Sequence, residues 1–276
     1  KRQKAKMRLG LQGPSGSGKT YSALQIARGL THSWNNIAII DTEANSSHLY
    51  SELGDFYVLS LQKPYTPERY IEALRMCIDS GAAVVIVDSI SHEWEGEGGI
   101  LDIHSSMVGN SFTNWSKITP RHNKLLSEFL QANCDIIVTI RTKTDYVLSE
   151  KNGKMIPEKI GLKGITKDGL DYELTLVLDL DIAHMAHASK DRTGLFVKSP
   201  PFIPNQKTGE RIKRWCQQGM GRTQVLRLLE AANTEHEVKR VYHDSGNFKI
   251  ELKKEFKEKW NQVVLKNQSK NGTDIK

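Results

Sequence analysis

The chain has 276 residues, enough to bury one sizeable hydrophobic core, and its 38% hydrophobic and 26% charged residues are typical of a globular protein. The longest apolar run, residues 82–87, is far too short to cross a bilayer, so no membrane partner is expected. The net charge of +7 is compatible with a polyanionic partner without requiring one. Three widely spaced cysteines and the lack of a signal-peptide pattern predict reduced thiols and a cytoplasmic location.

The first feature along the chain is a glycine-rich turn, residues 13–20, between a strand-like and a helix-like segment. It reads Gly-Pro-Ser-Gly-Ser-Gly-Lys-Thr and fits the phosphate-binding pattern G-x-x-x-x-G-K-[ST] at every position. Glycines let successive backbone N–H groups point at phosphate oxygens, and the N-terminus of the following helix adds partial positive charge. The residues predicted to bind the nucleotide here are Gly13, Pro14, Ser15, Gly16, Ser17, Gly18, Lys19, Thr20 and Tyr21.

Two side chains of this turn have separate expected roles. Lys19 is expected to reach the β- and γ-phosphates, and the Thr20 hydroxyl is expected to ligate Mg²⁺. The sequence therefore predicts a site for ATP or GTP with Mg²⁺ as the cofactor.

The next segments alternate between strand-like and helical patterns. Strands are predicted at four apolar runs, residues 37–41, 56–61, 83–88 and 135–141. Thr66 as N-cap, Pro67 at the first position and Gly81 as a stop predict one helix, and another is expected at about residues 120–130. This alternation predicts an α/β fold with a mostly parallel sheet flanked by helices.

The pattern changes after residue 141. Asn152-Gly153 between two short alternating arms predicts a β-hairpin. Antiparallel strands that finish the sheet are predicted at residues 172–180, 183–189 and 195–197. From about Gly221 the pattern is helical, with a capping box at residues 234–237. The predicted domains are a core at residues 1–215, a small helical region at residues 221–266 and a flexible tail at residues 267–276.

Carboxylates follow two of the predicted strands. Asp88 ends an apolar run at the place where a carboxylate that holds Mg²⁺ together with Thr20 belongs. Asp41 and Glu43 follow another strand and are expected at the same edge of the sheet. Either could orient and polarise a water molecule, or serve instead as a helix cap or a loop charge.

Several stretches resemble consecutive landmarks of the RecA-like recombinase ATPases: residues 39–43 followed by Tyr50, then residues 85–90, 95–99 and 136–141. The resemblance covers about residues 5–200 and implies a RecA-like core that binds and hydrolyses ATP. It implies that Glu43 activates the attacking water and that Tyr50 stacks on adenine. It also implies that Thr139 and Arg141 occupy the position of the polar γ-phosphate sensor, although the usual Asn-Gln pair is absent there.

Residues 189–194 resemble the Lys-x-Arg-x-Gly element of hexameric RecA-like helicases and related ATPases. The resemblance implies that Lys190 and Arg192 reach across a subunit interface to the γ-phosphate of a neighbour, where positive charge stabilises the anionic transition state. It therefore implies self-association into a ring or a filament with the nucleotide at the interface. The alternative is a basic turn between two strands.

Within this superfamily, the short length and residues 88–94 are most similar to phage-encoded single-strand-annealing recombination ATPases (Sak-type AAA family ATPases), which implies the cytoplasm of a bacterial or phage-infected cell. In the family two loops bind single-stranded DNA, and here they correspond to residues 95–117 and 142–169. The first is acidic and would by itself repel DNA. In the second, the candidate contacts are Lys143, Tyr146, Lys151, Lys154, Lys159 and Lys163. The alternative for these lysines is a solvated hairpin.

The leading hypothesis is a Mg²⁺-dependent ATPase that is stimulated by single-stranded DNA and acts in recombination or strand annealing, where a single-strand-binding protein would be a further partner. A second hypothesis is an ATP-dependent assembly or regulatory switch for a protein partner, with little affinity for DNA. A third, a small-molecule kinase, would need an arginine-rich lid that the sequence does not show.

Overall fold

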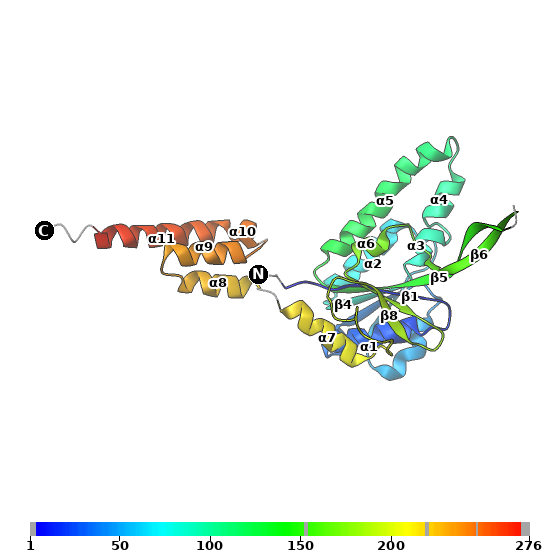
Figure 1. Cartoon of the computed structure of the whole chain (residues 1–276), viewed down its shortest axis with the longest axis horizontal. Helices are drawn as coiled ribbons and strands as arrows, with labels where there is room; N and C mark the ends of the chain where they lie inside the picture. The colour runs from blue at the N-terminus through cyan, green and yellow to red at the C-terminus, as the bar shows by residue number, and fades with distance from the viewer. Residues whose placement is uncertain (1–3, 152–153, 219–220, 247, 272–276) are drawn as a thin grey trace. The chain divides into compact units, whose positions relative to one another are not determined.

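The computed structural model describes residues 4–151, 154–218, 221–246 and 248–271, with the side chains of all of these except residues 144–162 and 267–271 (Figure 1). The chain divides into two compact units, one formed by Lys6–Lys213 and the other by Arg214–Lys276 together with Lys1–Ala5. No helix among the described residues is both long enough and apolar enough to cross a bilayer.

A mixed sheet forms the centre of the larger unit. Its strand order is β3-β2-β4-β5-β1-β7-β8, and β6 pairs with β5 outside this path. Neighbours from β3 to β7 run parallel, whereas β8 is antiparallel to β7 and β6 is antiparallel to β5. The strands are β1 Arg8–Gly13, β2 Ile37–Asp41, β3 Tyr57–Ser60, β4 Val84–Asp88, β5 Asp135–Lys151, β6 Lys154–Gly164, β7 Leu176–Leu180 and β8 Ala186–Asp191.

Helices cover both faces of this sheet, with α2 and α5 on one face and α1 and α7 on the other (Figure 1). Tyr70 of α2 and Phe129 of α5 join Val85 and Val87 of β4 in one buried apolar cluster. Every residue of β2 and β4 is buried, as expected for central parallel strands. The helices of this unit are α1 Lys19–Thr31, α2 Pro67–Asp79, α3 Ser91–Glu95, α4 Ile100–Ser106, α5 Ser111–Gln131 and α6 Leu170–Glu173, with 3₁₀ turns at Trp34–Asn36 and Ser46–Leu53. Helix α7 Gln206–Gln217 begins in this unit, and its residues from Arg214 on belong to the smaller one. The predicted α/β fold is confirmed.

The helix expected to start near Pro120 begins nine residues earlier, at Ser111. The side chain of Asn110 caps it by accepting the backbone N–H groups of Phe112 at 2.8 Å and Thr113 at 3.4 Å. Pro120 therefore lies inside α5 and does not begin it. The prediction gave too much weight to proline as a helix-start signal and missed the cap of Asn110.

The antiparallel strands expected after residue 172 are corrected in two places. Tyr172 belongs to the short helix α6, and the strand that follows, β7, is parallel to β1, so only β8 is antiparallel on this edge. Residues 195–197 form a turn instead of a strand. The carboxylate of Asp191 explains this turn because it accepts the backbone N–H groups of four residues, Thr193, Gly194, Phe196 and Val197.

The predicted hairpin after residue 141 is formed by β5 and β6. These strands pair from Thr142 opposite Gly164 to Lys151 opposite Lys154. The turn residues Asn152 and Gly153 lie outside the described residues. Because β5 also belongs to the central sheet, the hairpin is a direct extension of a strand that borders β1 and β4.

The smaller unit contains the helices α8 Arg222–Ala231, α9 Glu235–Asp244, α10 Phe248–Glu251 and α11 Lys253–Asn271. Its buried residues include Val225, Val238 and Phe256. The predicted capping box is confirmed, because Thr234 and Glu237 each accept the other's backbone N–H. The backbone of α11 reaches Asn271, so the first part of the expected tail is helical and the rest lies outside the described residues.

Candidate active site

The glycine-rich turn joins β1 to α1, as the sequence predicts. Gly16 and Gly18 adopt φ values of +78° and +81°, a left-handed conformation that other residues rarely adopt. Space is also limited at Gly18, because a Cβ there would lie 2.9 Å from Nδ1 of His184. The turn therefore needs glycine at these positions to reach the N-terminus of α1.

The ammonium group of Lys19 folds back over this turn. Its Nζ donates hydrogen bonds to the carbonyl oxygens of Gly13 at 2.9 Å and Pro14 at 2.8 Å. Burial lowers the pKa of Lys19, and the charges of Asp88 and Glu43 oppose that shift. The cation is thus held beside the loop whose N–H groups are suited to phosphate.

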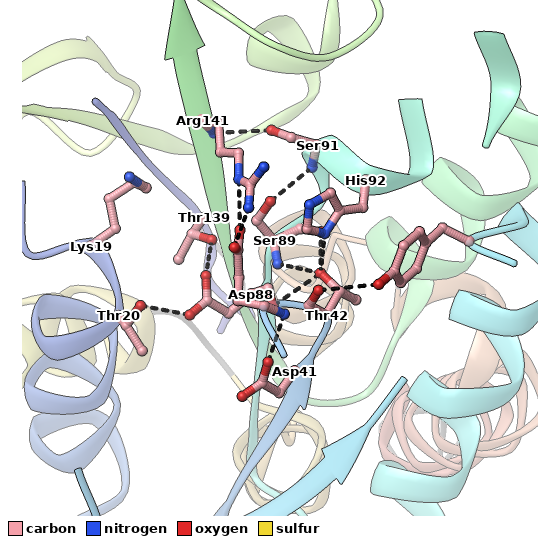
Figure 2. A network of polar contacts seen from close by, with 12 residues as sticks. Lys19, Thr20, Asp41, Thr42, Asp88, Ser89, Ser91, His92, Thr139 and Arg141 are labelled. Carbon is pink, nitrogen blue, oxygen red and sulfur yellow. Dashed lines mark hydrogen bonds and ion pairs between the residues drawn. The ribbon is translucent and has the colours of Figure 1, made fainter. Parts of the chain in front are cut away.

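Asp88, at the end of β4, joins three elements (Figure 2). Its Oδ2 accepts the Thr20 hydroxyl at 2.6 Å, and its Oδ1 accepts the Thr139 hydroxyl at 2.5 Å. Since β5 lies between β1 and β4, Thr139 reaches Asp88 from the intervening strand. Burial raises the pKa of Asp88, and these two hydrogen bonds oppose the shift. A hydroxyl and a carboxylate oxygen held side by side are hard donors that fit Mg²⁺.

The two carboxylates that follow β2 have different surroundings. Asp41 is buried and accepts the N–H of Glu43 at 2.7 Å, the N–H of Ser47 at 2.8 Å and the Ser47 hydroxyl at 2.5 Å. Its oxygens therefore hold the following turn. Glu43 instead pairs with both nitrogens of the Arg141 fork, with 2.7 Å between Nε and Oε1. This hydrogen-bonded carboxylate raises the pKa of Arg141. Of the two, Glu43 is the one that lines the same cavity as Lys19 and Thr20.

A cavity of about 540 Å³, called here the nucleotide cavity, brings most of the predicted residues together. Tyr50 forms part of its wall, and the ring of Tyr21 lies 6.1 Å from that of Tyr50. Thr139 is fully buried and contacts Asp88 instead of lining the cavity, and Ser17 is also fully buried. The lining residues are Ser15, Gly16, Gly18, Lys19, Thr20, Glu43, Ser46, Tyr50, Asp88, Glu95, Arg141, Thr142 and Ile165.

A cluster of polar residues behind this wall was not predicted. The Thr42 hydroxyl lies 2.8 Å from Nδ1 of His92 and accepts the N–H of Ser89 at 2.9 Å, and the Ser91 hydroxyl accepts the N–H of Arg141 at 2.9 Å (Figure 2). Burial, and then the charge of Arg141, lower the pKa of His92. The cluster ties the ends of β2, β4 and β5 together. Its only sequence signal is that polar residues directly follow β2 and β4.

Lys190 and Arg192 lie away from this nucleotide cavity. Asp191 between them pairs with Leu176, beside the start of β1, whereas the phosphate loop follows the end of β1. Lys190 donates to the carbonyl oxygen of Asp171, and Arg192 donates to that of Tyr172 at 2.7 Å. Burial lowers the pKa of Lys190. The structure thus places neither cation in the wall of this chain's own nucleotide cavity.

The predicted nucleic-acid residues fall into two groups. Lys143 and Lys163 line a second cavity of about 640 Å³, called here the lysine groove. The groove shares Glu95 and Ile165 with the nucleotide cavity. Its other lining residues are Trp94, Leu101, Trp115, Thr119, Gly164, Thr166, Lys167 and Asp168. Outside the described side chains lie Tyr146, Lys151, Lys154 and Lys159.

The sheet order, the glycine-rich turn and the contact between Thr20 and Asp88 define a P-loop nucleotide-binding protein. The AAA domain family matches residues 5–212, and the chain belongs to this family of P-loop ATPases. No curated protein matches the chain.

Proposed function

We propose that the protein hydrolyses ATP with Mg²⁺ as a RecA-like, phage-encoded ATPase and couples hydrolysis to single-stranded DNA in recombination or strand annealing. The observation that carries this proposal is the shared wall of the nucleotide cavity and the lysine groove, formed by Glu95 and Ile165. A strand of DNA in the groove would lie directly beside the residues that contact ATP.

The residues of the nucleotide cavity divide the chemistry among themselves. Thr20 and Asp88 would hold Mg²⁺, which neutralises the charge on the phosphates when it is bound. Lys19 would leave the carbonyl oxygens of its own loop and contact the phosphates, since both partners are neutral acceptors. Glu43 would orient the attacking water and accept its proton.

The ion pair between Glu43 and Arg141 controls this last step. While Arg141 occupies both carboxylate oxygens, Glu43 has reduced capacity to accept a proton from water. A γ-phosphate offers the guanidinium of Arg141 an alternative anionic partner. If Arg141 moves from Glu43 to the phosphate, the carboxylate of Glu43 is released. On β5, Arg141 is followed by Thr142, which lines the nucleotide cavity, and by Lys143, which lines the lysine groove. DNA bound in the groove can therefore influence this change of partner.

The lysine groove joins the two segments expected to bind DNA. Trp94, Glu95 and Trp115 come from or beside residues 95–117, and Lys143, Lys163 and Lys167 come from residues 142–169. The negative charge of the first segment is therefore offset, because lysines of the second segment line the same groove. Lysines with aromatic rings are suited to sequence-tolerant binding of a single strand.

The proposal is tested by measuring ATPase activity and oligo(dT) binding over a range of salt concentrations. Hydrolysis should rise with oligo(dT), and log K should fall with log salt at about −0.7 per phosphate neutralised. Replacing both Lys143 and Lys167 with Ala should flatten the slope by about 1.4 if each touches a phosphate. A wild-type protein with ATP and Mg²⁺ that has no single-strand affinity at low salt would contradict the proposal.

In that event the partner switch becomes the better function. One observation favours it. Beyond residues 5–212, which the family matches, α9 and α11 of the C-terminal unit form an apolar cavity of about 360 Å³. Tyr242, Phe256 and Trp260 line it together with lysines 239, 253 and 257. ATPase activity that responds to a protein partner and not to DNA would support this second function.

A further inference from the structure

Three aromatic rings from three different helices form a stack beside the lysine groove. Trp94 of α3 and Trp115 of α5 have ring centroids 5.9 Å apart and planes inclined by 22°. His104 of α4 continues the arrangement, with its centroid 4.2 Å from that of Trp115 and an angle of 20°. Trp115 is therefore stacked with both Trp94 and His104, and the two tryptophans line the groove.

Contacts with neighbouring residues hold Trp94 and His104 in place. Trp94 packs edge-on against His122 of α5 at 6.0 Å, and Nδ1 of His122 lies 3.0 Å from the carboxylate of Glu93. Glu93 and the His122 side chain are almost fully buried. On the other side, Nε2 of His104 lies 3.0 Å from the carbonyl oxygen of Ser111. These contacts orient the rings of Trp94 and His104 before any ligand binds, which lowers the ordering cost of binding.

Besides the two tryptophans, the wall of the groove carries three lysines and two carboxylates. Lys143, Lys163 and Lys167 line it, with Glu95 and Asp168 as the acidic lining residues. Lys163 pairs with Asp168 at 2.9 Å. Aromatic faces beside cations match a nucleotide whose base is unstacked, because the base offers a π-face and the backbone offers phosphate. Base pairs inside a duplex have both faces covered and cannot enter.

We propose that Trp94 and Trp115 form a base-stacking subsite that takes an unpaired base of single-stranded DNA, while Lys143 and Lys167 contact the adjoining phosphates. This subsite rests on the proposed function, because it assumes that the lysine groove is the place where DNA binds. Glu95 follows Trp94 directly and lines both cavities, so a base stacked on Trp94 lies one residue from the wall of the nucleotide cavity.

Tryptophan fluorescence tests the subsite directly, because stacking of a base on indole quenches its emission. The protein with a non-hydrolysable ATP analogue and Mg²⁺ is titrated with oligo(dT), and in parallel with a duplex of the same length. Oligo(dT) should quench the emission and the duplex should not. Trp94→Ala and Trp115→Ala should each weaken binding about 5- to 150-fold, the range that corresponds to loss of one stacked base.

Matched variants separate stacking from folding. Trp260→Phe removes a tryptophan of the C-terminal unit and should keep both the affinity and the quenching. Trp94→Phe and Trp115→Phe keep an aromatic ring in the stack, so each should bind more tightly than its Ala counterpart while losing part of the quenching. If an Ala variant has a lowered melting temperature, the affinity and quenching of the Trp94→Phe and Trp115→Phe variants are compared with those of Trp260→Phe instead.

The outcomes distinguish this subsite from the function on which it rests. A wild-type protein that binds oligo(dT) without quenching, and Trp94 and Trp115 variants that bind it as tightly as wild type does, would overturn the subsite and leave the proposed function standing. A wild-type protein that does not bind oligo(dT) at low salt would remove both. Equal quenching by duplex would also overturn the subsite, since no unpaired base is then needed.

Discussion

At the scale of single residues, the contacts of Lys19 and Glu43 assign them to different stages of the reaction. Lys19 donates to two carbonyl oxygens of the glycine-rich turn, and its proposed partner is the phosphates of a bound nucleotide. Glu43 lies in the same cavity but is held by Arg141, and its proposed substrate is water. Substitution of each residue should therefore affect a different measurement.

Lys19→Ala should weaken nucleotide binding by about 2–5 kcal/mol, because a partly buried cation loses its phosphate partners. Glu43→Gln should keep binding but lower kcat by roughly 10²- to 10⁴-fold, because the amide cannot accept the proton of water. Calorimetry with a non-hydrolysable analogue and steady-state kinetics separate the two effects. Near-normal turnover in Glu43→Gln would remove Glu43 from this role. Asp41, already holding three hydrogen bonds, would then need testing.

Arg141→Ala should lower the ratio of ATPase rates with and without oligo(dT) towards one, because the proposed link from the lysine groove to Glu43 runs through this side chain. Arg141→Lys should give an intermediate ratio, since an ammonium cannot occupy both carboxylate oxygens as the guanidinium fork does. Both ratios are measured at saturating ATP and oligo(dT). Unchanged ratios in both variants would show that Glu43 is controlled in another way.

The sequence predicted the placement of residues that are set by local order along the chain. The glycine-rich turn, Lys19 and Thr20 are consecutive, and Asp88 ends a strand whose apolar pattern is visible. The pairing of Glu43 with Arg141 joins residues 98 positions apart and depends on β5 lying near β2 in space. No periodicity predicts such a pair. The same holds for Trp94 and Trp115, which meet only because α3 and α5 pack together.

At the scale of elements, the sequence predicted strands and capped helices better than turns made by side chains. Thr66 and Pro67 begin α2 as expected, and the Thr66 side chain accepts the N–H of Arg69. The turn after β8 was mistaken for a strand because Leu195, Phe196 and Val197 have strand-forming side chains. The backbone N–H groups of Phe196 and Val197 instead donate to the carboxylate of Asp191, a preference that the apolar pattern does not reveal.

The contact between α1 and α7 gives a stability prediction at this scale. A Cβ at Gly29 of α1 would lie 2.0 Å from the carbonyl oxygen of Gln206, in the first turn of α7. Gly29→Ala should therefore destabilise the protein by about 1–3 kcal/mol or more. Without this contact, the same substitution inside a helix would stabilise by about 1 kcal/mol. The free energy of unfolding is measured in urea. A decrease supports the close contact at Gly29 and an increase contradicts it, with Gln25→Ala of the same helix as the control.

At the scale of the whole molecule, the two cavities lie within one chain, whereas Lys190 and Arg192 would need a second chain in order to contact ATP. The nucleotide cavity and the lysine groove share Glu95 and Ile165 as lining residues within one chain. Lys190 and Arg192 instead lie at and just after the end of β8, which β7 separates from β1, and they donate to the carbonyl oxygens of Asp171 and Tyr172. If these cations act on ATP, the nucleotide belongs to a second copy of the chain. Self-association into a ring or filament, which the sequence resemblance implies, stays a prediction.

Mixing two inactive variants tests this arrangement. Arg192→Ala should bind ATP as wild type does but hydrolyse it at least about 10³-fold more slowly, the lower range for an arginine supplied from a neighbour. Lys19→Ala should lose nucleotide binding. In mixed assemblies, some interfaces pair an intact nucleotide cavity with an intact Arg192, and these should recover hydrolysis. At equal amounts of randomly mixed variants, about one interface in four has this pairing, so recovery should follow the mixing ratio.

The control for this experiment is Lys198→Ala, which removes a cation from the same region outside the Lys-x-Arg-x-Gly element. Lys198→Ala keeps both Lys19 and Arg192. Mixed with Lys19→Ala, it should therefore give activity in proportion to its own amount and no more. Association of the variants is verified by light scattering or by differently tagged copies. Absence of recovery with Arg192→Ala at every ratio, when mixed assembly is verified, would show that Lys190 and Arg192 only stabilise the turn through Asp171 and Tyr172. The charge that stabilises the transition state would then have to come from within the chain, and Arg141, which already faces the nucleotide cavity, is the residue placed to supply it.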